Sequence, residues 1–468
     1  MKDSQKTTKR RSSQPELSRR DFIGRTAAAV GAFTIVPRYV LAGSGQAPPS
    51  EKLNIAAVGV GSQGITDVER VMSQNIVALC DVDDAYMAKN VARVKGGFDA
   101  FPKAKKYRDF RKMLEKQKDI DAVLIATPDH THAIVSMTAM KMGKHVYCEK
   151  PLTHTIYEAR QLAEAARQHK VATQMGNRGQ ATEGPRLICE WIWDGAIGPV
   201  RQVHVWTDRP VNWWPQGIDR PKDAPPVPET LDWDLWLGPA PYRPYHPAYA
   251  PYIWRGWWDF GTGALGDMGC HSFAPIFWAL KLGYPTTVEA SSTEVNSESY
   301  PLASIVRYKF PARGDMPPVE LTWYDGGLLP PRPEELEQDR QMGNDSGGII
   351  FIGDKGKIMT HHAGRSPRIT PESKMKEYKQ PPKTIPRSIG HFEEWLEACK
   401  GGKPAVANFD FAGPVAEVVL LGNIALRPEL KKKLAINRLY WDGVNMKVTN
   451  LPEANEFVHY QYRQGWSL

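Results

Sequence analysis

The stretch Leu53–Gly64, which reads LNIAAVGVGSQG, constrains the fold more than any other part of the chain. Its apolar start has the length and composition of a buried parallel strand. The strand runs into Gly59–Gly64, which fits the pattern G-x-G-x-x-G, and a helical pattern follows. In this pattern the first glycine permits a tight turn, the second lets backbone approach a pyrophosphate, and the third lets the helix lie close to the strand. The stretch therefore predicts a dinucleotide-binding turn.

An acidic residue follows at the distance that this turn requires. Asp81 closes a second predicted strand, 75–80, and lies 22 positions after Gly59. A carboxylate at this position accepts hydrogen bonds from both ribose hydroxyls and repels a 2′-phosphate, so the sequence favours NAD over NADP. The alternative is an ordinary strand-to-helix turn in which Asp81 caps the next helix.

Strands and helices alternate up to Met175, which is typical of a doubly wound parallel sheet. The strand 120–126 ends in the polar run 127–132, and the strand 144–148 ends in Glu149-Lys150-Pro151. Because the carboxyl ends of such strands form the ligand crevice, both endings are predicted to lie against the cofactor. Lys150–Pro151 is a candidate cis peptide. The predicted cofactor-binding residues are Gly59, Gly61, Ser62, Gln63, Gly64, Asp81, Thr127, Pro128, His130, His132, Glu149 and Lys150.

The composition changes after Gly176, and ten of the 15 tryptophans lie between Trp191 and Trp258. Four β-type runs follow, the last of them a hairpin, and a long loop is expected within 312–347. The stretch 261–271 leads into a predicted helix that ends at Leu280, and further helices are predicted at 389–399 and 411–426. The end, from Asn437, is aromatic and extended and is predicted to wrap a neighbour. The fold class is α/β, with an N-terminal Rossmann domain and a C-terminal α+β domain that holds a large open, mostly antiparallel sheet. The predicted segments are 1–42 (signal peptide), 43–52 (linker), 53–175 (NAD-binding domain) and 176–468 (substrate-binding and oligomerisation domain).

The first 42 residues have the pattern of a twin-arginine export signal. Ser18-Arg19-Arg20-Asp21-Phe22-Ile23 fits the twin-arginine core, an uncharged apolar run follows, and Val40-Leu41-Ala42 offers small residues for cleavage. The apolar run is too short to span a membrane, so no stable membrane insertion is expected after cleavage. The sequence therefore predicts a periplasmic or otherwise exported protein. A disordered basic tail and an uncleaved anchor are the alternatives.

This segment also accounts for most of the charge. Residues 1–42 carry nine Lys or Arg and three Asp or Glu, so only about +2 of the net +8 remains on the rest of the chain. The basic pI is therefore no argument for a nucleic-acid partner. The five cysteines lack metal-type spacing, and Cys80 and Cys148 are predicted to be buried thiols. Buried thiols suit a protein that folds, and loads NAD, before export.

Several motifs together resemble the Gfo/Idh/MocA family of oxidoreductases, the glucose-fructose oxidoreductase and inositol dehydrogenase type. The matching segments are Gly59–Gly64, Asp81, Ala126–His132, Glu149–Pro151, Gly195–Gly198 and Gly266–His271. They span nearly the whole chain after the signal and occur in the family's order. The resemblance implies a Rossmann domain, an open-sheet domain used in oligomerisation as a homo-dimer or tetramer, and a sugar or cyclitol substrate.

Oxidation of a secondary alcohol needs a base for the hydroxyl proton and a cation for the developing alkoxide. His271 suits the first role, because imidazole exchanges protons near neutrality, and Lys150 suits the second. Asp267 lies four residues before His271, on the same helical face, where it orients the imidazole or binds a substrate hydroxyl. The resemblance assigns the same three catalytic residues. The structural alternatives are that His271 hydrogen-bonds only to backbone, that Asp267 is a helix N-cap and that Lys150 is a surface lysine.

The substrate contacts are less defined. Members of the family often have an acidic residue four positions after the histidine, whereas this chain has Pro275 there, which is expected to kink the helix. Aromatic side chains are predicted mostly to fill the core, with one or two at the substrate mouth. His130, His132 and Asp129 lack further ligands at supporting spacing, so no metal site is predicted. His361 and His362 are interpreted as a surface pair. The predicted substrate contacts are Asn177, Arg178, Gln180 and Trp258.

Three functions remain open from the sequence. The first is an exported NAD(P)-dependent oxidoreductase that moves hydride between a tightly bound nicotinamide cofactor and a sugar, cyclitol or glycoside hydroxyl. The second uses the same chemistry transiently, through a keto-sugar, to cleave a glycosidic bond without net redox change. The third is a non-catalytic NAD-binding scaffold, against which the intact glycines and the three catalytic candidates argue.

Overall fold

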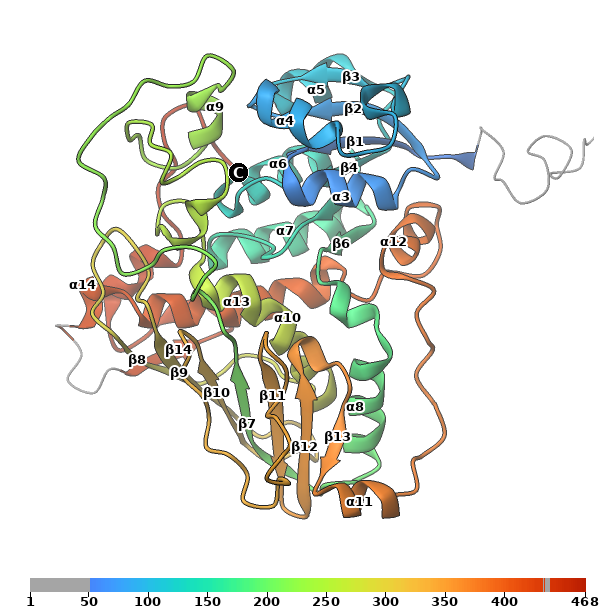
Figure 1. The fold of residues 1–468 in the computed structure, drawn as a ribbon, viewed down its shortest axis with the longest axis vertical. Helices are drawn as coiled ribbons and strands as arrows, with labels where there is room; N and C mark the ends of the chain where they lie inside the picture. The colour runs from blue at the N-terminus through green and yellow to red at the C-terminus, as the bar shows by residue number, and fades with distance from the viewer. Residues whose placement is uncertain (1–50, 432, 434–437) are drawn as a thin grey trace, which may run out of the picture. The chain divides into compact units, whose positions relative to one another are not determined.

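The computed structural model describes residues 51–431, 433 and 438–468 (Figure 1). The predicted signal peptide and residues 43–50 of the predicted linker lie outside the described residues. Within the described ranges, no helix has the length and apolar character needed to cross a membrane.

The first sheet is the predicted Rossmann sheet, with six parallel strands in the order β3-β2-β1-β4-β5-β6. Strand β1 lies at its centre, so Gly59 follows the point where the strand order reverses, which is the ligand crevice of such sheets. The buried residues of β1, β2 and β4 are almost all apolar, as strands covered on both faces require. The strands are β1 (Asn54–Val58), β2 (Asn75–Cys80), β3 (Lys105–Tyr107), β4 (Ala122–Ile125), β5 (His145–Cys148) and β6 (Thr173–Met175).

Helices connect these strands at the expected places (Figure 1). The last of them begins with a capping box, in which Thr155 Oγ1 accepts from the Glu158 amide and the Glu158 carboxylate accepts from the Thr155 amide. Lys150–Pro151 is cis. The helices are α3 (Ser62–Arg70), α4 (Asp84–Val91), α5 (Phe110–Lys116), α6 (Asp129–Lys141) and α7 (Ile156–His169).

The second sheet has nine strands in the order β13-β12-β11-β7-β10-β9-β8-β14-β15. Only the β7–β10 pair is parallel, which confirms the prediction of a mostly antiparallel sheet. Within 312–347, β10 forms at the third predicted β-type run, and the rest of the span is the expected loop. The strands are β7 (Val200–Trp206), β8 (Thr287–Ser292), β9 (Ser304–Phe310), β10 (Val319–Tyr324), β11 (Gly348–Gly353), β12 (Gly356–His361), β13 (Arg368–Thr370), β14 (Arg438–Asp442) and β15 (Lys447–Val448).

Helices α8, α10 and α13 share one hydrophobic core with the second sheet. Helix α10 packs against α8 and α13, and α13 also packs against α7 and β8, which joins the Rossmann domain to the second sheet. Helix α10 continues through Pro275 to Leu280 as one element. The sequence did not predict α8, whose first turn contains Gly184 and Pro185. Proline is tolerated there because the first-turn amides have no intrahelical partner. The helices are α8 (Glu183–Trp193), α9 (Trp233–Leu237), α10 (Gly263–Leu280), α11 (Glu372–Glu377), α12 (His391–Cys399), α13 (Phe409–Ala425) and α14 (Pro428–Lys431).

The tryptophan-rich segment, residues 207–262, forms its own small aromatic core around α9. Trp233 and Trp236 stack with ring centroids 4.7 Å apart, and Trp254 and Trp257 are buried beside them. Trp213 differs, because 46% of its surface is exposed. The core interpretation therefore holds for most of these side chains. All five cysteines are buried and free, as predicted for Cys80 and Cys148.

The described part of the end segment, residues 438–468, packs on its own chain, and its contact with a neighbour stays a prediction. Its first strand, β14, pairs with β8 on one side and with β15 on the other, so β15 forms the edge of the second sheet. Farther on, the Tyr462 hydroxyl donates to Glu158 Oε1 (2.6 Å) and Arg463 Nε donates to the Gly238 carbonyl (3.0 Å). These contacts return the end of the segment to the Rossmann domain and α9 (Figure 1).

Candidate functional site

The glycine-rich turn follows β1 as the sequence predicted. Gly59 has φ of +80°, and a Cβ there would lie 2.6 Å from the Ala126 carbonyl oxygen. A Cβ on Gly64 would lie 1.8 Å from the Gly59 carbonyl oxygen, so α3 rests directly on the turn. Any larger residue at these two positions therefore displaces backbone, which is the structural requirement behind the first and third glycines.

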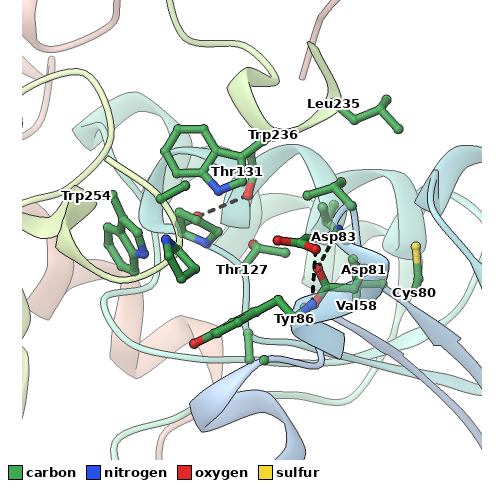
Figure 2. A pocket seen from close by; sticks show the side chains of 18 of the residues that line it. Val58, Cys80, Asp81, Asp83, Tyr86, Thr127, Thr131, Leu235, Trp236 and Trp254 are labelled. Atoms are coloured by element: carbon green, nitrogen blue, oxygen red, sulfur yellow. Dashed lines mark hydrogen bonds between the residues drawn. The ribbon is translucent and has the colours of Figure 1, made fainter. Parts of the chain in front are cut away.

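Gly61 has a different neighbour from the one the motif alone indicates. A Cβ at this position would lie 2.2 Å from Cε1 of Tyr86, whose ring packs against the turn. Tyr86 comes from the first turn of α4, where its amide donates to Asp83. In Figure 2 its side chain crosses the cavity from the Asp81 side toward Trp254. The sequence did not predict this aromatic side chain beside the turn.

Asp81 lies beside the turn and ties it to the second strand. Its Oδ2 accepts from the Val60 amide (2.8 Å) and its Oδ1 accepts from the Asp83 amide (3.1 Å). Each carboxylate oxygen retains a further lone pair for a ligand hydroxyl. Burial raises the pKa of Asp81 to about 6, against the opposing effect of these two amides.

One cavity extends from the glycine turn to Lys150. The Rossmann domain forms one wall, and the other comes from residues distant in sequence, among them Trp236 and Trp254 (Figure 2). Trp466, near the end of the chain, also lines the cavity. This shape suits a dinucleotide, with backbone amides at the turn, a carboxylate beside them and an apolar surface at one end. The predicted cofactor residues that line it are Gly59, Gly61, Ser62, Gln63, Asp81, Thr127, Pro128, Glu149 and Lys150.

His130 and His132 lie behind this wall rather than in it. The nitrogens of His132 contact the carbonyl oxygens of Pro151 (2.7 Å) and Thr127 (2.8 Å), and those of His130 contact Phe260 and Trp236. Burial lowers the pKa of each histidine to about 4, so each ring is neutral and donates to one of its carbonyls. His132 thus lies between the two loops that line the cavity and donates to one of them. The prediction that these rings bind the cofactor is not supported by their placement.

At the far end of the cavity, Lys150 Nζ lies 2.6 Å from Asp267 Oδ1. Burial alone would raise the pKa of Asp267, but the charges of Lys150 and Arg255 outweigh burial and lower this pKa. Burial likewise opposes the charge on Lys150, yet the carboxylate of Asp267 raises the lysine pKa. Both groups are therefore ionised at neutral pH, and the ammonium is held in one position.

His271 lies one helical turn after Asp267 on α10, as predicted. Its Nδ1 lies 3.1 Å from Asn177 Oδ1, while Asn177 Nδ2 donates to the Cys270 carbonyl (3.0 Å). Burial, followed by the charge of Lys150, lowers the pKa of His271 well below its ordinary value. The ring is therefore neutral, and because Nδ1–H donates to Asn177, its free lone pair lies on Nε2.

Two further residues join this cluster that the sequence did not predict. Arg255 lines the cavity, with Nε 3.6 Å from Asp267 Oδ1, and its guanidinium lies 4.2 Å from the Trp254 ring centroid. His362, interpreted as a surface residue, is instead partly buried, with its ring edge-on to His271 at 5.4 Å. For Arg255, the sequence feature that could have indicated this role is a cation within an aromatic run. For His362 no sequence feature indicates it, because its position depends on a turn between β12 and β13.

The remaining predicted substrate residues lie elsewhere. Arg178 forms ion pairs with the buried Asp67 of α3 and with Glu149, beneath the glycine helix. Gln180 is buried, and its Oε1 has no partner among the described residues. Trp258 packs on Tyr300, away from the Lys150 cavity. Only Asn177 touches a catalytic candidate, and it does so as the partner of His271.

Two family models match the chain. Residues 53–177 match the NAD-binding Rossmann fold of the Gfo/Idh/MocA oxidoreductase family, and residues 192–315 match that family's C-terminal alpha/beta domain. The chain is also 28% identical to an inositol 2-dehydrogenase of Salmonella typhimurium over 158 residues, which are 32% of this chain and 45% of that protein. A glycosyl hydrolase family 109 protein of Shewanella is 27% identical over 179 residues, 37% of this chain and 39% of that protein. These matches span less than half of either relative.

Among solved structures, the WlbA dehydrogenase of Bordetella pertussis in complex with NADH and UDP-GlcNAcA covers 83% of this chain and 99% of its own, with a TM-score of 0.55. At 16% identity this likeness concerns the fold alone. It includes both sheets, in agreement with the two family models. The chain belongs to the Gfo/Idh/MocA family of NAD-binding oxidoreductases.

Proposed function

We propose that this protein is an NAD-dependent oxidoreductase that acts on a secondary hydroxyl of a sugar, cyclitol or glycoside. The observation that carries the proposal is that Lys150 lines the same cavity as Asp81 and the glycine turn, and that its ammonium is paired with Asp267, one helical turn before the neutral His271. A fixed cation and a free imidazole base are the two groups that alcohol oxidation needs. The match to an inositol 2-dehydrogenase supports the substrate class.

The residues of the cavity fit a nicotinamide dinucleotide. The turn at Gly59 and the amides that follow it would hold the pyrophosphate, and Asp81 would hold the adenosine ribose, which favours NAD over NADP. When bound, the nicotinamide supplies a hydride acceptor. Trp236 and Trp466 cover the cavity from outside the Rossmann domain, which supports the proposal that the cofactor is held tightly.

Three side chains of the site, those of Lys150, His271 and Arg255, have separate roles in the proposed reaction. Lys150 binds the substrate oxygen and stabilises its developing negative charge, since Asp267 keeps the ammonium in place. His271 accepts the hydroxyl proton at Nε2, and Asn177 keeps that nitrogen unprotonated by accepting from Nδ1–H. Arg255 adds a second cation beside Asp267.

A second candidate function is redox-neutral cleavage of a glycosidic bond through a transient keto-sugar. The match to a glycosyl hydrolase family 109 protein supports it. The same residues would act, because a ketone in the ring would acidify the neighbouring C–H. Loss of that proton would expel the glycosidic leaving group, water would add to the resulting double bond, and return of the hydride to the ketone would leave no net redox change. Net NAD reduction distinguishes the two functions, since only the first accumulates NADH.

We also propose that residues 1–42 direct export by the twin-arginine route and that the mature chain forms a homo-oligomer. Five buried, free thiols support folding in a reducing compartment before export. Arg19→Lys and Arg20→Lys together should retain the protein in the cytoplasm in cell fractionation, and unchanged export would refute this route. Light scattering of the purified protein measures the oligomer.

The deciding experiment is mass spectrometry of the nucleotide that the protein releases on denaturation, after purification without added cofactor. Near-stoichiometric NAD(H) is the expected result. Incubation with myo-inositol, aldoses and aryl glycosides, followed at the NADH absorbance and by product analysis, then assigns net oxidation or cleavage. The proposal would be refuted if the protein neither carried nor bound a nicotinamide dinucleotide.

A further inference from the structure

A second cavity, of about 320 Å³, lies outside the site described above. Its described lining residues include none that line the Lys150 cavity. They come from the end of α13, the start of α7, the tryptophan-rich segment and the segment after β15. Four of its walls are the aromatic rings of Trp258, Tyr300, Phe457 and Tyr460.

Arg427 supplies a cation to this cavity. Its guanidinium carbon lies 4.1 Å from the ring centroid of Trp258 and 4.6 Å from that of Phe457. Among the described residues, no carboxylate lies within ion-pair distance of this guanidinium and none of its N–H groups has a hydrogen-bond acceptor. Burial lowers the pKa of Arg427 as a result. A partly buried charge without a partner is costly, and five N–H donors remain for a ligand.

A second polar group in the cavity also lacks a partner. Asn423 is 5% exposed, and its Nδ2 donates to the Thr262 carbonyl (2.8 Å), but its Oδ1 has no hydrogen-bond partner among the described residues. Two carboxylates line the cavity as well. Asp259 is already paired with Arg243, and Glu456 is exposed to solvent. The charges of Glu429 and Asp259 act to raise the pKa of Arg427, but burial outweighs them and lowers it.

These features define the chemistry of a ligand. A guanidinium fork matches a carboxylate or phosphate, which accepts two parallel hydrogen bonds. Aromatic walls suit the C–H faces of a sugar ring, and an unpartnered amide oxygen accepts from a ligand hydroxyl. We propose that this cavity binds a sugar that carries a carboxylate or phosphate group, with Arg427 holding the anion between Trp258 and Phe457. This site is separate from the proposed catalytic centre and does not depend on it.

Isothermal titration calorimetry of the full chain with D-glucuronate, D-glucose 6-phosphate and uncharged D-glucose tests the proposal. One of the two anions should bind at least about tenfold more tightly than D-glucose, since a charge-assisted fork contributes that much. Which anion binds tells carboxylate from phosphate recognition. Arg427→Gln should weaken this anion at least about tenfold, and Arg427→Lys should restore part of the affinity. Arg201→Gln, at a surface arginine paired with Asp354, is the control for loss of one positive charge.

The Lys150→Met variant separates this site from the proposed active site. Anion binding should persist in Lys150→Met, and its loss there would show that the probe enters the Lys150 cavity, which would overturn the proposal. Binding unaffected by Arg427→Gln, or no binding of either anion, would overturn it too. If circular dichroism shows that Arg427→Gln does not fold, Gln461→Glu serves instead, because this exposed residue lines the same cavity. The added carboxylate should weaken the anion and leave D-glucose unchanged.

Discussion

The two cavities each hold a partly buried cation, but only one of these cations has an ion-pair partner among the described residues. Lys150 lies 2.6 Å from Asp267, and the charges of the pair shift both pKa values toward the ionised forms. Arg427 lies between two aromatic rings without a described carboxylate at ion-pair distance, and burial lowers its pKa. The fold therefore pairs Lys150 with a carboxylate and leaves Arg427 available to a ligand in its cavity.

This difference indicates two uses of a buried charge. A group that stabilises a transition state must be in place before the reaction, so its orientation has to come from the protein, as Asp267 provides for Lys150. A cation that recognises an anionic ligand contributes most to binding affinity when no carboxylate of the protein already pairs with it. The ligand then supplies the compensating charge. Removing each cation therefore tests the comparison directly.

The largest expected effect is that of Lys150→Met on turnover. Loss of the ammonium removes the stabilisation of the developing alkoxide, and we expect kcat to fall by about 10³-fold. The cofactor should remain bound, because the glycine turn and Asp81 are unchanged, and its retention is measured by mass spectrometry of the denatured variant. Turnover within a few-fold of wild type would show that Lys150 has a structural and not a catalytic role.

The second effect concerns stability. Lys150→Met leaves the buried carboxylate of Asp267 with only Arg255 at 3.6 Å, so the free energy of unfolding should fall by about 3 kcal/mol. Arg427→Met leaves no described carboxylate unpaired and loses only contacts with two rings, so the change should stay within about 1 kcal/mol. Urea unfolding of both variants measures the difference. Adding Asp267→Asn to Lys150→Met should recover part of the loss, and equal losses in the two single variants would contradict the comparison.

The sequence predicted the Rossmann domain closely because its signals are local. Gly59, Gly64 and Asp81 act on neighbours within one strand, turn and helix, and each has the structural reason that the pattern implies. The hairpin of β11 and β12 and the helices α10 and α13 are likewise set by short-range patterns. The spacing of Asp267 and His271 placed both on one helical face, and the cis peptide at Lys150 was also expected.

What the sequence did not predict depends on contacts between distant segments. His130 and His132 stand in a cofactor-lining run, but α6 turns their rings toward backbone carbonyls of other segments. Trp258 was assigned to the substrate mouth, yet the segment that carries it packs against Arg427, 169 positions later in the chain. His362 reaches His271 only because the turn after β12 lies against α10. Such contacts leave no trace in residue spacing.

A smaller effect is expected at the opposite end of the Lys150 cavity. Asp81→Ser removes the carboxylate that favours ribose hydroxyls and repels a 2′-phosphate, so NAD affinity should fall about tenfold while NADP affinity rises. Fluorescence titration of the nucleotide-free protein with both reduced cofactors measures the change in preference. Because Asp81 also accepts from the Val60 and Asp83 amides, thermal unfolding of the variant serves as the control for a disturbed turn. An unchanged NAD to NADP ratio would show that Asp81 acts only as a structural cap.

The smallest effect, and the one that probes the base alone, is that of Asn177→Asp on the pH dependence of kcat/KM. Neutral His271 is the form that accepts the hydroxyl proton, so the oxidation rate falls once the pH drops below the pKa of His271. Burial, Lys150 and His362 lower that pKa, which keeps the base free well below its ordinary range. An aspartate beside Nδ1–H favours the imidazolium and raises the pKa of His271, so the acid limb should move to higher pH by about one unit.

The direction of this shift distinguishes a catalytic from a structural histidine. A carboxylate at 177 also gives up the hydrogen bond to the Cys270 carbonyl, and the resulting loss of stability lowers activity at every pH without moving the limb. The same substitution weakens the acid sensitivity of folding, because a histidine with a depressed native pKa contributes stability that is lost as pH falls below its unfolded value. An acid limb that stays in place while activity drops uniformly would assign the proton to another group. His362, edge-on to His271, would be the first residue to test in that case.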